Sequence, residues 1–193
     1  MNILLLGLVL FLGAHSLRIV ADGWRERRIA QFGALSWKAG YSLVSLAGLL
    51  MIINGYGAAR AASATVYASP GGLRLVALVL MLPALILLVA AYVPQTRIKA
   101  MVAHPMLLSV KVWALAHLLA NGRAVDLLLF GTFLLWAVFG YRAAKIRDRA
   151  AGTRYMAGPW SRDALAIAVG ALLWFGFVFG LHGWLIGVPL QPA

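Results

Sequence analysis

The main ionisable side chains within the apolar stretches of this 193-residue sequence are four histidines and one lysine: His15, His104, Lys111, His117 and His182. A neutral imidazole in an apolar medium must donate its one ring hydrogen, and an unmet donor there costs several kcal/mol. One such histidine is readily explained as a satisfied core residue, whereas four favour a bound metal or haem. Because the sequence has no cysteine, haem iron would take histidine, methionine or tyrosine as its axial ligand.

The spacing of these histidines narrows the kind of metal site. No two are four residues apart, as in helical zinc sites, and none lies in a cluster with a carboxylate. His104 and His117 are separated by 13 positions, or about 20 Å along a helix. A site with two histidine ligands must therefore join different helices.

Within residues 104–121, four polar or aromatic side chains are spaced four positions apart and would form one stripe along a helix: Ser109, Trp113, His117 and Asn121. Lys111 lies well inside the same stretch. A lysine at that depth either extends to the membrane interface or pairs with an anion, such as a haem propionate.

The composition tells us which elements must position these side chains. Hydrophobic residues make up 63% of the sequence, well above the share of about 45–50% in soluble domains. Six apolar runs are long enough, or nearly so, to cross a bilayer, which takes roughly 20 residues. They cover residues 2–20, 39–59, 73–93, 104–121, 125–141 and 164–187. The sequence therefore predicts a single all-α, polytopic membrane domain over residues 1–193, with Pro83 inside the third run and Ser161 and Asp163 starting the last helix.

Charge gives the orientation of this domain. The connections that follow runs one, three and five contain twelve lysines and arginines, against two in the other connections and the tails. By the positive-inside rule, the twelve face the cytoplasm, including the basic segment 142–162, and both termini are periplasmic in a bacterial inner membrane. This rule also explains the net charge of +12 without a nucleic-acid partner. The five acidic residues lie outside the middle of the runs, which argues against a carboxylate proton relay.

Gly176 and Gly180, and then Gly183 and Gly187, form two pairs spaced four apart in the last run. Such pairs are typical of close contact between membrane helices. We also expect the lipid bilayer as the main partner, together with a homo-oligomer or a respiratory-complex protein.

Several segments together resemble the NnrU family of small bacterial membrane proteins. They are Gly13-Ala14-His15-Ser16, Ala91-Tyr92-Val93-Pro94, His104-Pro105-Met106, the stretch from Trp113 to Gly122, and Leu181-His182-Gly183. The resemblance extends over nearly the whole chain, and it implies a link to denitrification and nitric oxide metabolism.

That family is similar to plant zeta-carotene isomerase, a haem b membrane enzyme that isomerises a polyene double bond. By its motifs, the resemblance implies haem b with His15 and His117 as iron ligands. Ala114 stands where the plant enzyme has a cysteine, so a cysteine-dependent ligand switch is absent. His182, about 8 Å from the outer helix end, matches the depth of His117, at about 6 Å, better than His15 does, at about 20 Å. His117 with His182 is therefore the rival pair.

Two other functions remain open at this point. His104-Pro105-Met106 after a basic connection resembles a segment of isoprenylcysteine carboxyl methyltransferases, which would imply S-adenosylmethionine as the cofactor. The third reading is a non-catalytic assembly or regulatory factor of the respiratory membrane.

Overall fold

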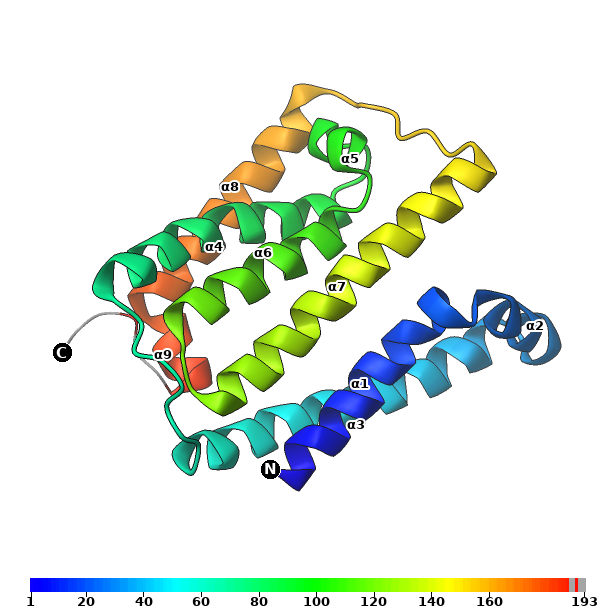
Figure 1. Ribbon diagram of the computed structural model, residues 1–193. Coiled ribbons are helices and arrows are strands. Elements are labelled where there is room, and N and C mark those ends of the chain that lie inside the picture. Colours follow the sequence, from blue (N-terminus) through cyan, green and yellow to red (C-terminus); the bar gives the residue numbers. More distant parts are fainter. Residues whose placement is uncertain (188–189, 191–193) are drawn as a thin grey trace. The chain divides into compact units, whose positions relative to one another are not determined.

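The computed structural model describes residues 1–187 and residue 190, and in this part the chain is almost entirely helical (Figure 1). The helices are α1 (Asn2–Val20), α2 (Asp22–Phe32), α3 (Ala34–Ala61), α4 (Gly71–Tyr92), α5 (Arg97–Val102), α6 (Pro105–Ala120), α7 (Ala124–Ala151) and α8 (Trp160–Gly176). A π-helical segment, η1 (Phe177–Leu181), connects α8 to α9 (His182–Ile186).

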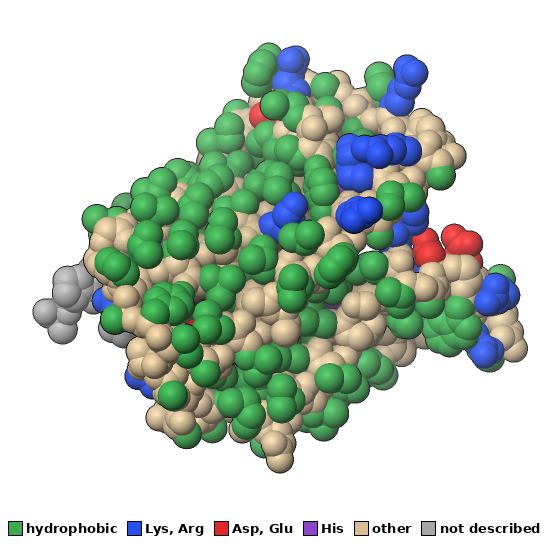
Figure 2. All heavy atoms as spheres, viewed as in Figure 1, with side chains coloured by type: hydrophobic (Ala, Val, Ile, Leu, Met, Phe, Trp, Pro, Cys, Tyr) green, Lys and Arg blue, Asp and Glu red, His purple; other side chains and the backbone are tan. Residues whose placement is uncertain are grey.

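Five of these helical stretches are long and apolar enough to cross a membrane: α1, α3, α4, α7 and the continuous stretch Trp160–Ile186. The fourth predicted run forms α6, which is apolar but has only 16 residues. Large apolar side chains are exposed along the spanning helices, as at Leu43 and Leu75, and hydrophobic atoms are spread over the face in Figure 2. An exposed apolar surface of this extent suits a lipid bilayer. The prediction of a polytopic all-α membrane protein is confirmed.

The helices extend beyond the predicted apolar runs. α3 begins at Ala34 and not at residue 39, and α7 continues to Ala151. Much of the basic segment predicted as a loop is therefore helical, because its alanines, arginines and lysine are good helix formers. Two further helices, α2 and α5, occupy segments that hydropathy marks only as connections.

Asp163 lies in the first turn of α8, next to the predicted helix start, and has a further role. α8 begins at Trp160 without a side-chain cap. The buried Asp163 carboxylate instead accepts hydrogen bonds from the backbone N–H groups of Arg97 and Ile98, at 3.2 and 3.0 Å. A carboxylate suits this position because the first N–H groups of a helix lack backbone partners. Asp163 thus holds the start of α5.

The chain divides into two compact units. The first comprises Met1–Ala68 and Asn121–Ala143, and the second comprises Ser69–Ala120 with the described residues from Ala144 onward. In the first unit α1 packs along α3, and in the second α4 packs against both α6 and α8.

Glycines allow α1 and α3 to approach closely. A Cβ atom at Gly55 would lie 2.5 Å from the backbone nitrogen of Leu4, and one at Gly48 would lie 2.7 Å from that of Phe11. Gly7 meets the backbone of Ile52 in the same way, at 2.7 Å. Small residues at such crossings let two helix backbones pack directly, which is the main source of helix association in lipid.

The last predicted span behaves differently from expectation. A Cβ atom at Gly180 would meet no atom of the described residues within 4 Å, so the part of the chain that the structure describes does not form the expected close contact there. In the second unit the close approach lies at Gly170, whose Cβ would be 2.7 Å from the Cα of Ile86 in α4.

Side-chain hydrogen bonds add to the packing of α4. The Ser109 hydroxyl in α6 donates to the carbonyl of Ala84 at 2.7 Å, and the Trp174 indole in α8 donates to that of Leu78 at 2.9 Å. Both carbonyls lie near Pro83, which is inside α4 and cannot donate a backbone hydrogen bond. Neighbouring helices can satisfy polar groups near an intramembrane proline in this manner.

The α1–α3 crossing yields the first prediction. Gly55→Ala places a methyl group against the Leu4 backbone and should lower the free energy of unfolding by about 1–3 kcal/mol, the usual cost of overpacking. The matched control is Gly57→Ala, because a Cβ atom there meets nothing within 4 Å. We expect this control to be neutral or stabilising, since alanine favours helix. Unfolding by sodium dodecyl sulfate in mixed micelles, followed by circular dichroism, measures both; equal stabilities would contradict the close crossing.

Candidate functional site

His15 lies in the first unit, half-buried on α1 and surrounded by aromatic rings. Its ring stacks on Phe11, with centroids 4.2 Å apart, and lies 5.1 Å from Tyr41 of α3 and 5.9 Å from Trp136 of α7. The Nδ1 atom is 2.7 Å from the Phe11 carbonyl oxygen, one helical turn earlier. Three helices of this unit therefore supply the side chains that position His15.

His117 has the same local arrangement on α6, in the second unit. Its Nδ1 atom is 2.8 Å from the carbonyl oxygen of Trp113, and the two rings are 4.9 Å apart. Trp113 and His117 are neighbours in the predicted stripe of side chains four positions apart, so this contact agrees with the sequence pattern. An aromatic residue also precedes His15 by four positions, so the sequence contains the signal for both sites.

These hydrogen bonds determine the chemistry of each imidazole. A carbonyl oxygen only accepts, so Nδ1 must carry the hydrogen in both histidines. In the neutral ring the lone pair then lies on Nε2, which is the nitrogen that can bind a metal. Histidine ligands in metalloproteins nearly always donate their other N–H in this way, which fixes the ring orientation.

His104 is engaged differently, although the sequence places it in the same group. Its Nε2 atom lies 2.8 Å from Oδ2 of Asp148, in the helix that ends at Ala151. The Tyr155 hydroxyl donates to both oxygens of that carboxylate, at 3.1 and 3.2 Å. The sequence shows no signal for this cluster because 44 residues separate His104 from Asp148.

The two remaining predicted residues lie in the second unit with His117. Lys111 is half-buried on α6, six positions before His117. His182 is the first residue of α9, directly after the π-helical segment, and is also half-buried. The pairings of His117 with His15 and with His182 stay predictions. Among the described residues, no three histidine, aspartate or glutamate side chains gather as a metal cluster.

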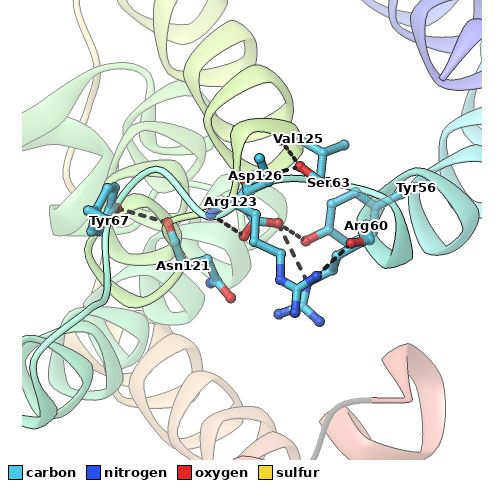
Figure 3. A network of polar contacts seen from close by, with 9 residues as sticks. Tyr56, Arg60, Ser63, Tyr67, Asn121, Arg123, Val125 and Asp126 are labelled. Atoms are coloured by element: carbon cyan, nitrogen blue, oxygen red, sulfur yellow. Dashed lines mark hydrogen bonds and ion pairs between the residues drawn. The ribbon is translucent and has the colours of Figure 1, made fainter.

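The first unit contains a polar network that the sequence analysis did not predict (Figure 3). Asp126, near the start of α7, has no solvent exposure. Its Oδ1 accepts from the Tyr56 hydroxyl at 2.6 Å and lies 3.6 Å from Nε of Arg60. Its Oδ2 accepts from the backbone N–H of Arg123 at 3.1 Å. The carboxylate therefore joins the end of α3 to the beginning of α7.

Two further contacts extend this network. The Arg123 guanidinium donates to the Arg60 carbonyl at 2.8 Å, and the Ser63 hydroxyl accepts from the N–H of Val125 at 3.0 Å. Tyr67 donates to the Asn121 carbonyl at 2.8 Å (Figure 3). Its burial and the nearby Asp126 carboxylate raise the pKa of the Tyr67 phenol above its ordinary value. The phenol therefore remains protonated and keeps this hydrogen bond at neutral pH.

The long apolar helices define a polytopic integral membrane protein. The family model described as NnrU protein matches residues 3–190, and the chain belongs to this family. Comparison with curated proteins and with solved structures gave no match.

The Asp126 network generates a prediction about stability. Asp126→Asn keeps the shape of the side chain but removes its charge, which leaves Arg60 without its anion and weakens three contacts. We expect a loss of about 2–3 kcal/mol, as for hydrogen bonds to charged groups. Asp22→Asn is the matched control, because Asp22 makes a partly exposed pair with Arg25 at 3.4 Å, and such pairs contribute about 0–1 kcal/mol. Denaturation in mixed micelles compares the two variants, and an equal loss would rule out the tie at Asp126.

Proposed function

We propose that this chain is a haem-binding membrane protein in which His15 and His117 supply iron ligands. One observation carries the proposal: both imidazoles donate Nδ1–H to the carbonyl four residues earlier, at 2.7 and 2.8 Å. This bond holds each ring in the tautomer whose Nε2 can bind iron. The absence of cysteine from the sequence leaves histidine as the natural ligand type.

The aromatic surroundings of His15 support this proposal. Phe11, Tyr41 and Trp136 provide flat aromatic surface around the imidazole, and apolar surroundings limit the access of water to a bound iron. Haem b, when bound, would supply one-electron redox chemistry and a position for a small ligand such as nitric oxide. The residues of the chain would orient the iron ligands and exclude water.

The biological setting of the proposal comes from the family. Its association with denitrification and nitric oxide metabolism supports a redox or sensing role in the bacterial inner membrane. Its similarity to zeta-carotene isomerase supports isomerase-type chemistry, with Ala114 excluding a cysteine ligand at that position.

The methyltransferase alternative has one observation in its favour. His104, Asp148 and Tyr155 form a partly exposed polar cluster beside the His104-Pro105 segment. A colourless protein that binds S-adenosylmethionine, and loses it in His104→Ala, would support methyl transfer. A colourless protein that binds neither compound would support an assembly or regulatory factor.

The haem proposal predicts the effect of removing each imidazole. His15→Ala and His117→Ala should each abolish or shift the Soret band of the purified protein, because each removes a residue that would hold the iron. His104→Ala should retain the band, because its Nε2 atom bonds Asp148. An unchanged spectrum in both of the first two variants would reject this pair. Loss in His117→Ala and His182→Ala, with retention in His15→Ala, would support the rival pair.

Lys111 gives a second variant for the same experiment. We propose that its ammonium group assists cofactor retention by pairing with a propionate. Lys111→Met should then lower haem content without changing the ligand spectrum of the remaining holoprotein, while Lys111→Arg should retain more haem. Full occupancy in the methionine variant would show that Lys111 only extends to the interface.

We further propose that both termini are periplasmic, from the twelve-to-two distribution of basic residues between alternate connections. An alkaline phosphatase fusion at Ala193 should be active, since that enzyme needs an oxidising compartment for its disulfides. A green fluorescent protein fusion at the same position should be dark. Bright fluorescence at Ala193 would contradict this orientation.

A further inference from the structure

An open groove lies within the first unit, between α1, α2 and α3. Its volume is about 680 Å³, within the range of about 300–1,000 Å³ for ligand sites. The lining is almost entirely apolar, and it includes Trp24 and Phe32 of α2 and Trp37 of α3. Arg28 is the only charged residue among those that line it.

The position of Arg28 places one cation at the wall of this apolar groove. Trp24, Arg28 and Phe32 follow one another at four-residue intervals on α2, so they share one face of the helix. The Arg28 guanidinium lies 5.5 Å from the centre of the Trp24 ring and 5.9 Å from that of Phe32. It also donates to Oε1 of Gln31 at 2.9 Å. A guanidinium has five N–H donors, so this contact leaves several for a ligand.

Two glycines form part of the groove wall, and the space in front of them is not filled by other atoms of the described chain. Gly13 and Gly40 line it, and a Cβ atom built on either one meets no atom within 4 Å. The glycines of the α1–α3 crossing differ, because a Cβ atom at Gly55 would meet backbone at 2.5 Å. A larger side chain at Gly13 or Gly40 would therefore fill the groove without disturbing the helix crossing.

The helix α2 is suited to the membrane surface. It combines arginines with Trp24, Ile29 and Phe32, which is typical of a helix that lies in the headgroup region. The charge distribution assigns α2 to the cytoplasmic side, where anionic lipids and basic residues attract each other. A molecule that fits the groove there has an apolar chain and one anionic group.

We propose that this groove binds one anionic phospholipid, with an acyl chain between α1 and α3 and its phosphate at Arg28. The arginine fork matches a phosphate better than a point charge would, because it can donate two parallel hydrogen bonds. The aromatic rings of Trp24 and Phe32 hold the guanidinium at the mouth of the groove. The groove shares Tyr41 with the surroundings of His15, but lipid binding at Arg28 does not require bound haem.

The test counts lipids on the detergent-purified full-length protein by native mass spectrometry. Dioleoylphosphatidylglycerol is titrated against dioleoylphosphatidylcholine, which has the same chains and no net charge. We expect one phosphatidylglycerol bound about tenfold more tightly than phosphatidylcholine, because the choline cation of the latter offsets the attraction between its phosphate and Arg28. Sodium oleate serves as a third probe, with the same chain and no phosphate.

The variants locate the site. Arg28→Gln should lower the affinity for phosphatidylglycerol about tenfold, to that of phosphatidylcholine, while Arg27→Gln, an exposed neighbour outside the groove lining, should not. Gly40→Leu should remove the bound lipid by filling the groove, while Gly57→Leu should retain it, because Gly57 also faces open space but lies outside the lining. Helix content and elution volume verify that each variant is folded.

Three results would overturn the proposal: equal affinity for the two phospholipids, retention of selectivity in Arg28→Gln, or unchanged binding in Gly40→Leu. Oleate that binds as tightly as phosphatidylglycerol would show that the occupant is a fatty acid. Haem content is measured on the same samples, so that a failure of lipid binding can be distinguished from a failure of haem binding.

Discussion

A charged carboxylate with no access to water is the strongest local constraint in the first unit. Burial of the Asp126 carboxylate alone would carry a large desolvation free energy. Its attraction to Arg60 offsets this free energy only when further hydrogen bonds complete the site. Tyr56 and the N–H of Arg123 supply these bonds, so the end of α3 and the start of α7 must meet at one place. The course of α7 from this point carries Phe133 and Trp136 to the rings around His15.

Polar groups in an apolar bundle need hydrogen-bond partners. This requirement also determines the hydrogen bonds of the candidate iron ligands. His15 and His117 each meet it with a carbonyl of their own helix, which needs no second element. This solution also places the lone pair of the neutral ring on the nitrogen that faces away from the carbonyl, as a metal ligand would require. His104 meets the requirement with the Asp148 carboxylate, and its Nε2 atom is thereby engaged. Identical residues in similar apolar segments thus acquire different chemistry from their partners.

Features that repeat along the chain could be predicted from the sequence, and features that join distant segments could not. The apolar runs predict the spanning helices, and the stripe of one residue in four predicts that Trp113 adjoins His117. The hydrogen bond from Tyr56 to Asp126 joins residues 70 positions apart, and the hydropathy pattern does not predict it. Glycine spacing predicted close contact at the pairs Gly176/Gly180 and Gly183/Gly187. The tight crossing of α1 and α3 instead lies at Gly48 and Gly55, because the position of the facing helix determines where a glycine is needed. The groove depends on α2, which the apolar pattern marks only as a connection.

The haem content of the purified wild-type protein tests the central claim most directly. The protein would be produced in cells supplied with a haem precursor, purified in mild detergent, and analysed by the pyridine haemochrome method against its protein concentration. The account predicts haem b in near-stoichiometric amount, with a Soret band typical of histidine ligation. A folded, helical preparation that remains colourless under these conditions, and gains no such band when haem is added, would contradict it.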